Sequence, residues 1–305
     1  MRRRDEALRS PGRRRRLGSV DQRQRRLERE VGQELEGEAQ RLAGRARGGD
    51  PYAEACLRAL ELEGFAYEGM QTFACGGQSF PIARFQHEQT GLVFCLIPGG
   101  TSLLGSPGGQ GRDNEYPQHE VAVPPFLLAD TPCTQAAWTQ LGLENPSHFK
   151  GANRPVEKVS WDDAQGFCEK AGLRLPSEAE WEFACRAGTQ TAYCFGDGEA
   201  ELGRYAEFEG NNNSETKDVG GKLPNAFGLF DVHGNVLEWC QDVWHDGYRG
   251  AASDGSAWNS AGAFRINRGG SWYEDAWNCR SANRNWDLPA FRRYYLGFRP
   301  ARSLP

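Results

Sequence analysis

The C-terminal segment 265–305 mixes two kinds of side chain that serve different chemistry. Short frames of Gly, Arg and small residues stand at 268–272, 279–284 and 296–301. Between them lie large aromatic residues beside acids and an arginine. Such clusters have neither the aliphatic periodicity of a core nor the small polar composition of a plain loop. Rigid aromatics that supply contact area, with a few charges for specificity, are typical of a binding surface.

We therefore predict that twelve side chains of this segment contact a ligand: Tyr273, Glu274, Asp275, Trp277, Asn278, Trp286, Asp287, Leu288, Phe291, Arg293, Tyr294 and Tyr295. The alternative is an ordinary domain in which these aromatics line a pocket. The two interpretations differ in exposure, because large aromatics are normally buried in a monomer.

Cysteine and histidine offer little other chemistry. The nine cysteines are scattered without a C-x-x-C pair, which argues against a zinc ribbon or a thioredoxin-type site and favours free buried thiols in a reducing cytoplasm. None of the five histidines is spaced i, i+4 from another, so we expect structural histidines. The chain shows neither a signal peptide nor eighteen consecutive apolar residues, so we expect a cytoplasmic protein that does not enter a membrane.

Charge separates the first fifty residues from the rest. Residues 1–50 hold fifteen arginines and nine acids, a net +6, so 51–305 carry −11 of the total −5. Residues 27–46 are rich in helix-forming types. We expect 1–50 to be a flexible or helical extension. Nucleic-acid binding by this arm is the alternative, which the intermixed acids weaken because they reduce the field that phosphates require.

Helix and strand signals place the aromatic segment at the end of a mixed domain. Asp50 followed by Pro51 predicts a helix start. Short β-like pieces such as 78–85 follow, so we assign 51–89 to a small entry subdomain. The main domain is expected over 90–305.

Within the main domain, three apolar runs predict strands at 91–97, 121–123 and 126–128. Three helices are predicted from N-caps, over 135–141, over 161–171 and from residue 178 onward. The caps are Thr134, Ser160 and Ser177, and Glu180 stands where a capping box requires it. Segment 188–262 shows little periodicity, which indicates irregular backbone.

Five segments resemble the sulfatase-modifying-factor domain, the family of formylglycine-generating enzymes: 94–106, 154–164, 173–184, 224–239 and 268–272. The resemblance covers about 90–301 and implies an α+β, C-type-lectin-like fold with much irregular structure. Gly269 and Gly270 permit positive φ or close backbone approach. Arg268, Arg280 and Arg299 are expected to donate buried hydrogen bonds to loop carbonyls.

The resemblance to formylglycine-generating enzymes implies two copper-binding cysteines, five residues apart, after Gly-Gly-Ser. Counted from Ser271, those places hold Glu274 and Cys279, and counting back from Arg284 puts Cys279 out of register. One thiolate does not supply the two-sulfur site that Cu(I) prefers. The chain also resembles the iron-dependent sulfoxide synthases of ergothioneine biosynthesis, but it lacks their three-histidine site. An oxidoreductase of the formylglycine-generating family with an altered active site remains the alternative function.

The alternation in the tail resembles the variable proteins of diversity-generating retroelements. In that family the fold is the same, and error-prone reverse transcription at template adenines rewrites a C-terminal segment. The resemblance places the variable segment at 265–301. It implies a non-catalytic, receptor-like protein that binds a protein or another macromolecule through residues 273–295.

The resemblance also implies a structural Ca²⁺ site. Its ligands would be the carboxylates of Asp231 and Glu238 and the carbonyls of Gly234 and Val236, which are the hard oxygens that calcium prefers. The alternative is a loop closed by hydrogen bonds without metal.

Overall fold

The structure, a computed structural model, describes residues 36–305 and divides the chain into two units between Leu57 and Arg58. In the first unit, residues 36–47 are helical, as predicted for that part of the arm. The predictions for residues 1–35 lie outside the described residues. Helix α2 (Pro51–Leu60) begins as predicted, because Asp50 Oδ1 accepts hydrogen bonds from the N–H groups of Tyr52 and Ala53.

The larger unit contains an antiparallel five-stranded sheet, ordered β1-β2-β3-β6-β11. Its strands are β1 (Phe65–Cys75), β2 (Gln78–His87), β3 (Val93–Ile97), β6 (Phe126–Ala129) and β11 (Ala301–Ser303). The runs predicted at 91–97 and 126–128 form two of its central strands. Residues 65–87, assigned from sequence to an entry subdomain, belong to this sheet, because β2 pairs with β3 and buries Ile82 and Phe85.

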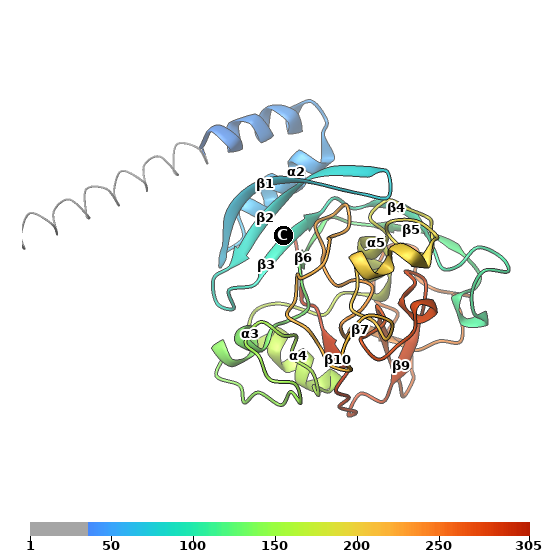
Figure 1. The fold of residues 1–305 in the computed structure, drawn as a ribbon. Coiled ribbons are helices and arrows are strands. Elements are labelled where there is room, and N and C mark those ends of the chain that lie inside the picture. The colour runs from blue at the N-terminus through green and yellow to red at the C-terminus, as the bar shows by residue number, and fades with distance from the viewer. Residues whose placement is uncertain (1–35) are drawn as a thin grey trace, which may run out of the picture. The chain divides into compact units, whose positions relative to one another are not determined.

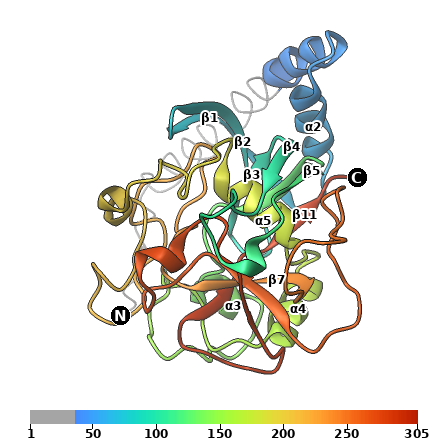
Figure 2. The same cartoon turned by 90° about the vertical axis from the view of Figure 1, so that its right-hand side faces the viewer.

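A second sheet carries most of the C-terminal segment. Its order is β10-β7-β8-β9, and its strands are β7 (Leu237–Val243), β8 (Arg265–Arg268), β9 (Asn285–Asp287) and β10 (Leu296–Phe298). Three of these four strands come from 265–298. Pairing of β8 and β10 with β7, and of β9 with β8, fixes the backbone of that segment at several points. Strands β4 (Gly100–Leu104) and β5 (His119–Val123) form a separate hairpin, shown in Figure 2.

The three predicted N-caps are confirmed. Thr134, Ser160 and Ser177 accept backbone hydrogen bonds at the starts of α3 (Gln135–Gln140), α4 (Trp161–Lys170) and α5 (Glu178–Arg186). Glu180 completes the predicted capping box. Short 3-10 helices also occur at η1 (Asp113–Glu115), η2 (Glu199–Arg204) and η3 (Ala276–Cys279).

Helix α5 joins the layers of the larger unit. It contacts the β4–β5 hairpin, beside which Figures 1 and 2 label it, and it also contacts β7 and β8. Trp181 and Phe183 of α5 share one hydrophobic core with Leu128 of the first sheet and Ile266 of the second. The fold is α+β with long irregular connections, as predicted.

Candidate binding surface

Buried arginines hold the C-terminal frame in place. Arg268 donates to the carbonyls of Ser281 and Ala282 and pairs with Glu178 and Glu182. Burial alone would raise the pKa of Glu182, but Arg186 and Arg268 lower it to about 2. Pairing and hydrogen bonding are what make charges tolerable inside a protein.

Two further frame arginines follow the same rule. Arg280 donates to the Trp277 carbonyl at 3.0 Å and pairs with both oxygens of Glu115 at 2.8 and 2.9 Å. Arg284 pairs with both oxygens of Glu178 at 2.7 and 2.8 Å. Bonds to loop carbonyls are thus confirmed, whereas the carboxylate partners come from distant segments and carry no local signal in the sequence.

The Gly-Gly turn after β8 is as tight as predicted. Gly269 and Gly270 have φ of 102° and 68°. A Cβ on Gly270 would lie 2.6 Å from the sulfur of Cys279. The turn therefore packs directly against the end of η3, and a side chain at Gly270 would displace it.

Five aromatic side chains project from this frame. Seven large hydrophobic residues are exposed in the described part of the chain, and five are predicted contact residues, with exposures between 39% and 56%: Tyr273, Trp277, Trp286, Phe291 and Tyr294. Asp275 is exposed too, while Glu274, Asn278, Asp287, Leu288, Arg293 and Tyr295 are half-buried. The structure therefore does not place these aromatics in a core.

One group of exposed aromatics forms a tyrosine cluster. Tyr273 stacks on Tyr295 with ring centroids 5.5 Å apart, and Tyr294 meets both rings edge-on at 6.4 and 5.3 Å. His148 and Phe149 extend the cluster, lying 6.2 and 6.4 Å from Tyr294. The sequence reasoning missed these two residues, because their loop lies far from the segment in sequence.

A second group surrounds Trp286. Its ring lies 4.2 Å from Phe264 and 6.1 Å from Trp244, both outside the predicted set. Nearby, Arg293 pairs with Asp287 at 3.2 Å and lies over the Phe291 ring at 4.7 Å. The predicted residues thus gather in two aromatic groups with a charged pair among them.

Helix η3 presents the remaining predicted residues. Asp275 has a structural role that was not predicted, since its Oδ1 accepts from the Asn278 N–H and caps η3. The Trp277 ring lies 3.9 Å from the Arg280 guanidinium, and Arg112 donates to the Asn278 side chain at 2.7 Å. These contacts hold η3 from both sides, so Trp277 is presented by stiff backbone.

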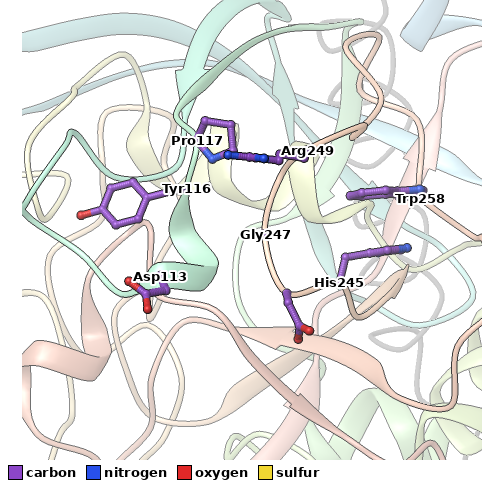
Figure 3. Close-up of a pocket in the computed structure, with 8 residues that line it drawn as sticks. Asp113, Tyr116, Pro117, His245, Gly247, Arg249 and Trp258 are labelled. Carbon is purple, nitrogen blue, oxygen red and sulfur yellow. The ribbon is translucent and has the colours of Figure 1, made fainter.

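A pocket of about 610 Å³ lies between residues 113–117 and residues 245–258 (Figure 3). His245 and Trp258 stack at 3.5 Å on one side, and Tyr116 and Pro117 form the opposite wall. Arg284 joins the two walls, donating to the carbonyls of Asn114 and His245. None of the twelve predicted contact residues lines this pocket.

The places that hold copper-binding cysteines in formylglycine-generating enzymes do not form such a site here. Cys279 is fully buried and packs with Tyr193 and Leu202 in a small hydrophobic cluster. Burial raises the pKa of its thiol well above the usual value and that of Glu274 to about 7. An apolar, protonated thiol is neither a good nucleophile nor a copper ligand.

His233 shows the structural role predicted for the histidines. Burial lowers its pKa to about 4, so the ring is neutral. Its Nδ1 donates to the Cys279 carbonyl at 2.8 Å, and its Nε2 accepts from the Cys194 N–H at 3.0 Å. Both ring nitrogens form hydrogen bonds with the backbone, so His233 has a structural role beside η3.

Two of the four predicted calcium ligands, Glu238 and Gly234, already accept hydrogen bonds from the protein. Both oxygens of Glu238 accept from Arg299, at 2.7 and 3.0 Å, and Trp181 and a second Arg299 contact fill the remaining lone pairs. The Gly234 carbonyl accepts from the Val236 N–H. Asp231 Oδ1 is buried without a partner, and burial raises the pKa of Asp231 to about 6.

The guanidinium of Arg299 therefore supplies a positive charge at Glu238. Across residues 36–305, no three His, Cys, Asp or Glu side chains are grouped to hold a metal ion. None of the described helices has the length and apolarity needed to cross a membrane.

Comparison with known proteins finds relatives in sequence and in structure. The curated relatives include the formylglycine-generating enzyme of Mus musculus, 33% identical over 196 residues, which are 59% of this chain and 52% of the relative. Serine/threonine-protein kinase pkn1 of Chlamydia caviae is 32% identical over 245 residues, 70% of this chain and 38% of the relative. The chain thus spans about two fifths to one half of the length of these relatives.

Among solved structures, PvdO from Pseudomonas aeruginosa matches with a TM-score of 0.66 and 30% identity, over 78% of this chain and 100% of that one. Variable protein 1 of Treponema denticola matches with a TM-score of 0.61 and 28% identity, over 77% and 99%. These neighbours confirm the C-type-lectin-like fold of the formylglycine-generating type. Residues 81–304 match the model described as the sulfatase-modifying factor enzyme 1-like domain, and the chain belongs to that family.

Proposed function

We propose that the chain is a non-catalytic, receptor-like variable protein of a diversity-generating retroelement, which binds a protein or another macromolecule through residues 273–295. The observation that carries this proposal is the exposure of Tyr273, Trp277, Trp286, Phe291 and Tyr294 on a frame of buried arginines. The likeness to a solved variable protein supports it.

The physical advantage of this arrangement is separation of folding from binding. The frame residues are buried and paired, whereas the projecting rings make few contacts that the fold needs. Rigid presentation lowers the ordering cost of association. Side chains at the projecting positions can therefore change without loss of the backbone that presents them.

The rings of Phe149 and Trp244, which contact Tyr294 and Trp286, enlarge the proposed surface with residues outside the variable segment. Exposed aromatic rings suit a macromolecule better than a small ligand, which needs most of its area enclosed. We also propose a cytoplasmic location, since all nine cysteines are free and buried. Nucleic-acid binding by the arm stays the less favoured alternative.

An oxidoreductase of the formylglycine-generating family is the second candidate function, favoured by the relatives of that name. The two functions are separated by incubating the protein with a cysteine-containing sulfatase peptide, copper and oxygen, and searching for the aldehyde by mass spectrometry. We expect no aldehyde, because Glu274 replaces one thiol and the other is buried. A genuine formylglycine-generating enzyme is the positive control. Turnover that disappears in Cys279→Ser would overturn the binding proposal.

A further inference from the structure

Two of the nine cysteines lie in contact, although they are 119 residues apart in sequence. Cys75 ends the edge strand β1, and Cys194 lies in the turn that follows Tyr193. Their sulfurs are 3.6 Å apart, and the Cys75 sulfur is 3.4 Å from the Cys194 carbonyl. Gly76 makes this approach feasible, since a Cβ there would lie 2.2 Å from the Cys194 oxygen.

We propose that Cys75 and Cys194 form an oxidisable dithiol, which closes to a disulfide when hydrogen peroxide reaches it. A disulfide requires about 2.05 Å between sulfurs, so the two sulfurs, which are 3.6 Å apart, must approach each other by about 1.5 Å. Both side chains are buried, so a water-sized oxidant reaches them more readily than a peptide disulfide does.

The reaction balances without any further reagent. The Cys75 thiolate attacks one peroxide oxygen, the O–O bond breaks, and hydroxide leaves and is protonated to water. The Cys194 thiol then attacks the sulfur of the resulting sulfenic acid, loses its proton and releases a second water. Two thiols are oxidised and one peroxide is reduced. Contact with Cys194 lowers the pKa of Cys75, which makes Cys75 the attacking group.

The disulfide would act on the support of η3. Tyr193 donates from its hydroxyl to the Ala276 carbonyl at 2.8 Å, at the start of η3. The Cys194 N–H bonds to His233, which holds the Cys279 carbonyl at the other end. A bond from Cys194 to β1 would therefore restrain both ends of η3. The disulfide itself is independent of the proposed binding function, whereas its effect on ligand binding rests on it.

The first test uses the full chain and hydrogen peroxide. After oxidation, remaining thiols are alkylated in denaturant and counted by intact mass and peptide mapping. We expect loss of two thiols, a cross-linked peptide pair containing Cys75 and Cys194, and its disappearance with dithiothreitol. Cys75→Ser should abolish the cross-link, and the matched buried variant Cys95→Ser should retain it. Nine alkylated thiols, or a cross-link between other cysteines in wild type, would overturn the proposal whatever the variants do.

The second test measures amide hydrogen exchange in the oxidised and reduced full chain. Exchange at residues 274–280 should slow on oxidation and recover on reduction, while α4, which has no contact with the pair, serves as the internal reference. Unchanged exchange at 274–280 in a protein carrying the mapped disulfide would refute the coupling to η3 and leave the dithiol chemistry established. Neither readout depends on a ligand, so failure here and failure of the proposed function are distinguishable.

Discussion

Trp272 and Tyr273 are neighbours in the chain with opposite surroundings. Trp272 is 5% exposed, meets Phe149 edge-on at 5.5 Å and donates from its indole to the Tyr294 carbonyl. Tyr273 is 56% exposed. Trp272→Ala should therefore cost roughly 3–5 kcal/mol of unfolding free energy, as for other buried aromatics. Tyr273→Ala should change it by no more than about 0.5 kcal/mol. Urea unfolding of both variants checks this, and equal losses would contradict the division into frame and surface.

Glu274 gives the surface a dependence on pH. Burial raises its pKa from 4.5 to about 7. Below the ordinary value the carboxyl is protonated in both the folded and the unfolded chain. Between 4.5 and about 7 the unfolded chain loses the proton first, so folding becomes less favourable as pH rises. Above a pH of about 7, Glu274 is ionised in both states, and the free-energy penalty for folding no longer grows.

Glu274→Gln removes the ionisation and keeps the shape. The variant should match wild type near pH 4 and exceed its stability near pH 8, with the difference growing across the interval. Urea unfolding at several pH values measures it. Taking the difference cancels the other buried acids, such as Asp242, whose pKa burial also raises to about 7. A difference independent of pH would show that Glu274 ionises normally.

Substitution of Glu238 tests whether Arg299, and not a metal ion, supplies the counter-charge of this carboxylate. Its replacement by Gln leaves the buried Arg299 guanidinium without a counter-charge, which should cost about 3–5 kcal/mol. The exposed Glu120→Gln is the matched control and should cost little. Because Arg299 already neutralises Glu238, the melting temperature of wild type should be unaffected by EDTA. If the melting temperature falls in EDTA and recovers when calcium is added, the predicted metal site is present.

At the scale of elements, deletion of the arm tests whether the larger unit folds without it. The described part of the arm is polar helix, and the contacts divide the chain within α2. A chain beginning at Pro51 should retain the melting transition of the larger unit. Loss of the Asp50 cap should weaken only the start of α2, by about 1 kcal/mol. Calorimetry of the truncated and full chains measures this, and a broad transition without cooperativity would assign the arm to the fold.

Elements with local signals were predictable, and elements held by distant partners were not. Caps such as Ser177 with Glu180 act within one turn, so spacing alone reveals them. Strand β7 follows an irregular segment and is held by β8 and β10, both far along the chain. The same reason hid Phe149 and Trp244 from the predicted surface, and hid Glu238 as the partner of Arg299. The aromatic positions were predictable because their composition conflicts with every local alternative.

For the molecule as a whole, the frame is what the proposed variable surface would require. Carboxylates from α5, η1 and β7 pair with the arginines of the C-terminal segment. These buried pairs specify where the backbone lies, while the projecting rings leave it unchanged. On the proposed function, stability would reside in one set of positions and specificity in another, as diversification requires.

The central claim, that residues 273–295 are a diversified binding surface on a constant frame, is tested most directly by sequencing the 3′ coding end and its flanks in the source genome. We expect a near-copy of this coding end that differs at adenines, beside a reverse transcriptase gene. Substitutions among independent isolates should fall at codons of the projecting residues and spare Arg268, Gly269, Gly270 and Arg299. An intact flank with neither near-copy nor reverse transcriptase, and substitutions spread evenly over frame and surface codons, would contradict it.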